Sequence, residues 1–142
     1  MNQILTDAQS LHDEIITNRR TIHQFAEIGF DLPQTYAYIF NKLTEYGYQP
    51  KKVGKMGITC LAGKPGRTIL LRADMDALPM AEESGESFAA VNGHCHSCGH
   101  DCHSAMLLGA AKLLKQRENQ LHGTVKFMFQ PAEEIMGGAK DM

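Results

Sequence analysis

Residues 68–79, TILLRADMDALP, place two aspartates directly after an almost continuously apolar run. Such a run predicts a strand over residues 68–73 that is buried on both faces, as in a parallel sheet. In open α/β sheets, ligands bind beyond the carboxyl ends of the strands. The sequence therefore predicts that Asp74 and Asp76 lie at a functional edge of the sheet.

The segments around this strand show helical spacing first and short apolar runs later. Gly47 follows one of the helical patterns and is expected to end that helix. The predicted helices cover residues 7–28, 33–46 and 104–115, and the other predicted strands cover 49–54, 57–62 and 123–129. The last two strands, 68–73 and 123–129, are separated by the length of a helical crossover. This order predicts the α/β fold class, with the helix over 104–115 buried.

Composition sets the class of protein more broadly. The chain has 142 residues, 43% of them apolar and 21% charged, with a net charge of −2. These values fit one globular domain and give no electrostatic basis for binding nucleic acid or an anionic membrane. No apolar run is long enough to span a bilayer, and residues 1–20 lack the features of a secretory signal. We therefore expect a cytoplasmic protein with reduced cysteines.

Cysteines and histidines crowd into residues 94–103, which contain seven of them. Cys98 and His100 stand two apart in a loop with a glycine, so both side chains can face one site. A thiolate and an imidazole suit Zn, Mn, Co or Ni. One alternative is a closed structural zinc site built on Cys95 and Cys98, although no second ligand pair follows at the usual spacing. Plain thiols are the other alternative.

Two adjacent glutamates, Glu133 and Glu134, follow the last predicted strand and Pro131. Neighbouring side chains in a non-helical segment point in different directions, so one can bind a metal while the other holds a proton. The alternative is a solvated acidic turn. Apolar neighbours and a metal cluster at the same edge of the sheet favour the functional interpretation. The three segments expected to meet there are residues 72–79, 98–103 and 130–134.

Four motifs carry a resemblance to a known family: RADMDALP, HSCGHDCHSAMLLGAAKLL, FQPAEE with GGAKDM, and RRTIHQFAEIGFDLPQTYAYI. They resemble the metal-dependent amidohydrolases that include hippurate hydrolase, N-acyl-amino-acid amidohydrolase and plant indole-acetyl-amino-acid hydrolase. The resemblance implies a three-layer α/β/α sandwich of the zinc-peptidase type. It further implies that residues 1–142 are the N-terminal part of the catalytic domain, without the lid domain and the C-terminal part.

The resemblance also implies roles for individual residues. Cys98 matches a thiolate that bridges two metals, and His100 and Glu134 match ligands. Glu133 matches the general base that takes a proton from the attacking water. Asp76 matches the acidic residue of the RADMDALP motif and is placed with the catalytic residues.

Four further residues near these motifs receive no such role. Asp74 stands where related peptidases carry a metal-binding histidine, so it is not assigned as a ligand, although it could orient a ligand imidazole. His103 is expected near the site. Cys95 and Cys102 depart from the small residues usual in the family.

The implied activity is hydrolysis of the amide bond of N-acyl amino acids or peptides, with two divalent ions, Zn, Mn, Co or Ni, in the complete site. The implied partners are a small-molecule substrate, no nucleic acid and no membrane, with a homodimer or larger oligomer for the full-length protein. Because the family's remaining ligands lie downstream, the 142-residue chain alone is expected to show little or no amidase activity and to expose a sheet edge. Two alternatives remain: a Cys/His metal-binding or redox-sensing module without catalysis, and a non-catalytic partner of a complete subunit.

Overall fold

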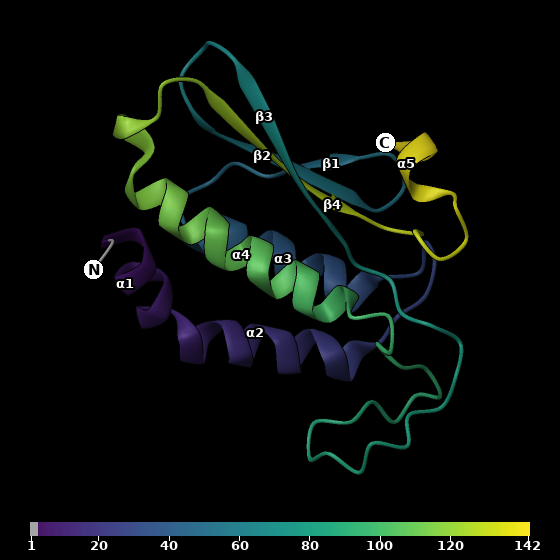
Figure 1. Cartoon of the computed structure of the whole chain (residues 1–142). Helices are drawn as coiled ribbons and strands as arrows, with labels where there is room; N and C mark the ends of the chain where they lie inside the picture. Colours follow the sequence, from purple (N-terminus) through teal and green to yellow (C-terminus); the bar gives the residue numbers. More distant parts are fainter. Residues whose placement is uncertain (1–2) are drawn as a thin grey trace.

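A mixed sheet with the strand order β1-β2-β4-β3 forms one layer of the computed structural model, which describes residues 3–142 (Figure 1). The helices and strands, in chain order, are α1 (Gln3–Ser10), α2 (His12–Phe25), α3 (Pro33–Glu45), β1 (Lys51–Val53), β2 (Gly57–Gly63), β3 (Thr68–Asp74), α4 (His100–Gln116), the 3-10 helix η1 (Glu118–Gln120), β4 (Thr124–Gln130) and α5 (Gly138–Asp141). The predicted α/β class is confirmed.

Strands β3 and β4 run parallel, and the crossover between them contains α4. Strands β1, β2 and β4 pair antiparallel. The predicted helical crossover is thus confirmed. Its register pairs Asp74 with Gln130, so the segments that follow both strands leave the sheet at the same edge.

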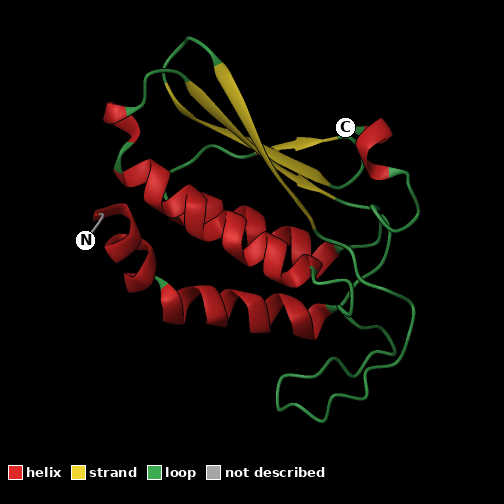
Figure 2. Cartoon of the chain, in the orientation of Figure 1, coloured by secondary structure: helices red, strands yellow, loops and turns green. Residues whose placement is uncertain are grey.

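The core lies between the sheet and helices α2, α3 and α4, which lie together on one side of it (Figure 2). Phe127 and Phe129 of β4 are fully buried against apolar side chains of α2, α3 and α4. Burying aromatic side chains of this size contributes about 2 kcal/mol each, so this contact fixes α4 on the sheet. Ser104 of α4 also donates a hydrogen bond of 2.8 Å to the backbone oxygen of Asp74, which ties the helix to the end of β3.

Strand β3 is not buried on both faces, contrary to the sequence prediction. It is an edge strand, and Ile69 and Leu70 are 62% and 51% exposed. Leu61 on β2 is 58% exposed. The described residues therefore supply the sheet and one helical layer of the predicted sandwich. The exposed edge that we expected is present, and association through it remains a prediction.

The helix boundaries differ from the prediction at two places. The helix predicted over residues 7–28 is broken at Leu11. Helix α2 then ends at Phe25, before Gly29, because the next residue, Ala26, adopts a left-handed φ of 38°. Helix α4 begins four residues earlier than predicted, at His100, because Gly99 adopts a left-handed φ of 86° immediately before it. In the described part of the chain, no helix combines the length and the apolar character that a bilayer span requires.

Candidate active site

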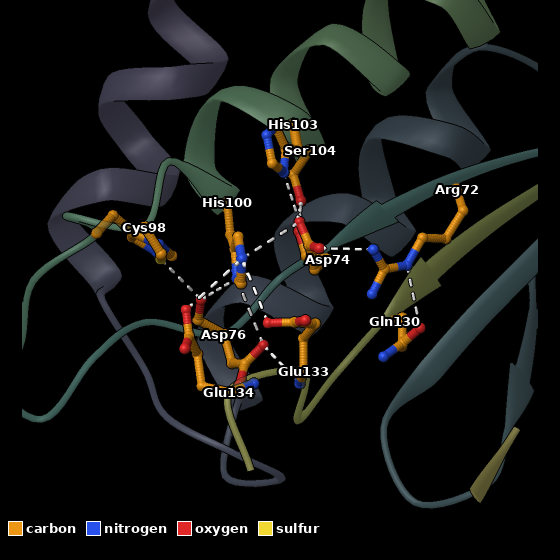
Figure 3. Close-up of polar contacts among 11 residues, drawn as sticks. Arg72, Asp74, Asp76, Cys98, His100, His103, Ser104, Gln130, Glu133 and Glu134 are labelled. Atoms are coloured by element: carbon orange, nitrogen blue, oxygen red, sulfur yellow. Dashed lines mark hydrogen bonds and ion pairs between the residues drawn. The ribbon is translucent and has the colours of Figure 1, made fainter. Parts of the chain in front are cut away.

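Three segments distant in the sequence meet beyond the carboxyl ends of β3 and β4 (Figure 3). Single donor atoms of Cys98, His100 and Glu134 all lie within 4.8 Å of one another. The Nε2 atom of His100 is 3.7 Å from the Oε2 of Glu133 and 3.7 Å from the Oε1 of Glu134. The structure thus brings together all the residues for which the sequence predicted catalysis or metal binding.

The sequence predicts that all three segments lie at the ends of strands, but this is wrong for the Cys/His segment. It is preceded by a loop and leads directly into α4. Cys98 lies in a turn closed by a hydrogen bond of 3.0 Å from the backbone N–H of Gly99 to the carbonyl of His96, and His100 is the first residue of α4. The start of a helix carries a partial positive charge that favours an anionic ligand such as a thiolate. The segment therefore reaches the expected edge from a helix terminus.

His100 is oriented by the backbone of the RADMDALP motif. Its Nδ1 lies 2.9 Å from the carbonyl oxygen of Asp76, and only a protonated nitrogen can donate to that acceptor. The Nε2 atom consequently faces the two glutamates. Burial lowers the pKa of His100, but hydrogen bonding to Asp76 and Cys98 and the charge of Asp74 outweigh it and raise the pKa to about 11.

Asp76 anchors the glutamate pair. It is fully buried, and its carboxylate accepts hydrogen bonds from the backbone N–H groups of Glu133, at 3.0 Å, and Glu134, at 3.1 Å. Burial raises its pKa, but hydrogen bonds from His100 and from these two N–H groups lower it overall. We infer that Asp76 acts by positioning the glutamates.

Replacing Asp76 by alanine is expected to lower the free energy of unfolding by about 3 kcal/mol, because two hydrogen bonds to a buried charge are lost. Asp76→Asn keeps one acceptor oxygen and should lose about half as much. Urea unfolding measures both, with Asp31→Ala as a control at an exposed carboxylate. Unfolding midpoints that agree for Asp76→Ala and Asp31→Ala would refute the anchoring role.

Asp74 lies beside both His103 and His100, and its Oδ1 is 3.6 Å from the Nε2 of His100. Its Oδ1 accepts a 2.6 Å hydrogen bond from the Nδ1 of His103, and its Oδ2 lies 2.8 Å from Arg72. Asp74, His100 and His103 also have donor atoms within 4.8 Å of one another. The guanidinium of Arg72 disfavours a second cation there, so Cys98, His100 and Glu134 form the better metal site.

A buried polar network beside the site had no role in the sequence prediction. His23 of α2 lies between two carboxylates, 2.7 Å from Asp101 and 2.9 Å from Glu82, and Arg19 donates to Asp101 at 2.6 Å. Burial raises the pKa of Glu82, but hydrogen bonds from Ser84, His23 and a backbone N–H lower it overall, to about 2. The network joins α2, α4 and the loop before Cys98. In the sequence, the only indication of this network is the polar character of Arg19 and His23 within the helix predicted over residues 7–28.

Comparison with known proteins gives the family. The model of Peptidase family M20/M25/M40 matches residues 70–142, which include the three segments that build the site. The chain belongs to this family.

Individual relatives agree with this assignment. The N-acyl-L-amino acid amidohydrolase of Geobacillus stearothermophilus is 40% identical over 91% of this chain and 36% of its own length. The IAA-amino acid hydrolase ILR1-like 6 of Arabidopsis thaliana is 46% identical over 87% of this chain and 27% of its own length. The crystal structure of the Bacillus subtilis YXEP protein, described as a dinuclear metal binding peptidase from the M20 family, matches with a TM-score of 0.88. That match has 40% identity and covers 94% of this chain and 38% of that protein. The chain thus spans well under half of the length of these relatives.

Proposed function

We propose that residues 1–142 form the N-terminal part of the catalytic domain of a metal-dependent amidohydrolase that acts on N-acyl amino acids. The observation that carries this proposal is the convergence of Cys98, His100 and Glu134 beside the free carboxylate of Glu133. The relatives named as N-acyl-L-amino acid amidohydrolase and IAA-amino acid hydrolase support the substrate class.

The residues fit a divalent metal. A thiolate, an imidazole and a carboxylate are donors that Zn, Mn, Co and Ni accept, and the Nε2 atom of His100 faces the glutamate pair while its Nδ1 contacts the backbone. We propose two ions in the complete site, supported by the dinuclear site named for the YXEP protein. Cys98 would bridge them, and His100 and Glu134 would each bind one.

Bound divalent ions supply Lewis acidity toward the scissile carbonyl and the attacking water. Glu133 is the residue of this chain placed to move the proton. Its side chain is 41% exposed and lies beside the donor cluster, whereas Glu134 is 26% exposed. We propose that Glu133 takes a proton from the attacking water and delivers it to the leaving nitrogen, which releases a carboxylate and a free amino acid.

We extend the proposal to a cytoplasmic location, to an activity like that of hippurate hydrolase, and to a homodimer or larger assembly of the full-length protein. The four free cysteines support a reducing compartment. Exposed apolar side chains on the sheet, Leu61 and Leu70, support association with further protein surface.

Metal content of the purified chain tests the proposal most directly. The wild type is compared with Cys98→Ala and Cys95→Ala by elemental analysis. Near-stoichiometric metal that is lost in Cys98→Ala and kept in Cys95→Ala is the expected result. Equal loss in both variants would indicate a closed cysteine-rich site, and a metal-free wild type would contradict binding by these three donors alone.

Metal affinity is expected to depend on pH. Coordination requires an unprotonated Nε2 on His100, and the raised pKa of about 11 means that a proton must leave as the metal binds. Loss of this proton contributes a rise of about tenfold in apparent affinity per pH unit below pH 11, and the proton lost from the Cys98 thiol adds to the slope. Zn²⁺ titrations at several pH values measure the slope, and an affinity independent of pH would contradict the predicted role of His100.

A further inference from the structure

A histidine outside the proposed ligand set, His96, lies against Cys98 in the protein interior. Its side chain is only 4% exposed, and its Nδ1 is 4.0 Å from the Sγ of Cys98. The backbone hydrogen bonds between Leu78 and Cys95 fix the preceding residue, and the turn closed by Gly99 fixes the following ones. The position of His96 is therefore set by the fold on both sides.

The two ring nitrogens of His96 differ in their surroundings. The Nε2 atom is buried and has no hydrogen-bond partner among the described residues, whereas Nδ1 faces the sulfur. Burial disfavours the charged form of this ring and so favours a neutral imidazole. A neutral imidazole carries one N–H, and a buried N–H without an acceptor is rarer than a buried acceptor without a donor. These facts place the proton on Nδ1.

Cys98 needs such a donor when it acts as a ligand. Its Sγ lies 3.7 Å from the carbonyl oxygen of Asp76, which is an acceptor that only a protonated thiol satisfies. Once the thiol loses its proton to bind a metal, that contact no longer stabilises it. Hydrogen bonds from neighbouring groups orient metal ligands and adjust their affinity for the ion.

We propose that His96 is a positioning residue, whose Nδ1–H donates a hydrogen bond to the Cys98 sulfur and directs it toward the metal. This inference rests on the proposed function, in which Cys98 is a ligand. It assigns to His96 a role that acts through Cys98, without contact with the substrate.

Substitutions at His96 distinguish the contribution of Nδ1 to metal binding from that of Nε2. The side-chain amide nitrogen of Asn takes approximately the place of Nδ1, and that of Gln the place of Nε2. His96→Gln is expected to lower Zn²⁺ affinity by about 10- to 100-fold in a chelator competition, while His96→Asn stays close to wild type. The control is His94→Gln, because the Nδ1 of His94 contacts the carbonyl of Ala26 rather than the site. The thiolate-to-metal absorption band of the Co²⁺-loaded chain should change in His96→Gln alone.

A measurement without metal or mutation completes the test. Nitrogen NMR of the metal-free wild type reports which ring nitrogen of His96 is protonated. A proton on Nδ1 supports the proposal, and a ring protonated on Nε2 alone overturns it. Equal Zn²⁺ affinities of His96→Gln and wild type would also overturn it, provided that Cys98→Ala loses metal. If Cys98→Ala keeps its metal, the ligand assignment itself fails, and this inference fails with it.

Discussion

Glu133→Gln is expected to reduce amide hydrolysis by about 10²- to 10⁴-fold, because the amide cannot accept the proton of the attacking water. The metal content should stay unchanged, since Glu134, Cys98 and His100 hold the proposed ligand atoms. The assay uses an N-acyl amino acid and a version of the protein long enough to contain a complete two-metal site. Turnover and elemental analysis are measured on the same preparation.

The neighbouring glutamate provides the matched control. Glu134→Gln should lose both activity and metal, because the substitution removes a proposed ligand rather than the proton acceptor. A Glu133→Gln variant that keeps more than about a tenth of the wild-type rate would refute the general-base assignment. A sensor or structural module, the alternative open from the sequence, should be indifferent to the Glu133 substitution.

Gly138→Ala is expected to disrupt the turn that carries the glutamates. A Cβ atom at Gly138 would lie 1.6 Å from the backbone oxygen of Pro131 and 2.8 Å from its carbonyl carbon. Backbone atoms cannot give way as a flexible side chain does. The turn also depends on two hydrogen bonds of 3.0 Å, from the N–H groups of Gly137 and Gly138 to Ala132. We expect a loss of about 3 kcal/mol or more in unfolding free energy, together with weaker metal binding.

Gly137→Ala is the control for this substitution. Its φ is −103°, which alanine adopts readily, and its Cβ would meet only side-chain atoms, the ring of Phe30 at 3.2 Å and Ile135 at 3.8 Å. We expect a cost below about 1 kcal/mol. If the urea unfolding midpoints of Gly138→Ala and Gly137→Ala agree, the turn around Gly138 can accommodate the added Cβ atom and the prediction is wrong.

Much of the site could be predicted because its residues follow elements with strong sequence patterns. The apolar runs ending at Asp74 and Gln130 predicted two strands, and the helix between them predicted parallel pairing, which the register confirms. Parallel pairing alone brings Asp76 and Glu133 to one edge of the sheet. The site roles themselves depend on the resemblance and on the tests above.

Other features depend on tertiary contacts that no local pattern encodes. The apolar run of β3 looks the same in the sequence whether the strand is central or at an edge, so the sequence does not identify β3, with Ile69 and Leu70, as the exposed edge strand. The contact of His23 with Asp101 joins residues 78 positions apart. The anchoring of both glutamates through their backbone N–H groups leaves no mark on side-chain identity, so it could not be predicted from the sequence. The catalytic role that the resemblance implies for Asp76 stays a prediction.

The parallel crossover between β3 and β4 has a consequence for how the chain folds. Asp76 and Glu134 are 58 positions apart, and they meet only after the whole crossover has closed. Closing such a long loop lowers the conformational entropy of the chain before the contacts that offset this cost have formed. We therefore expect this pairing to form late in folding. A metal that binds only the closed arrangement would stabilise it by about 2.7 kcal/mol at a concentration a hundred times its dissociation constant. Metal supply during synthesis would then govern how much of the chain reaches its native state and escapes proteolysis.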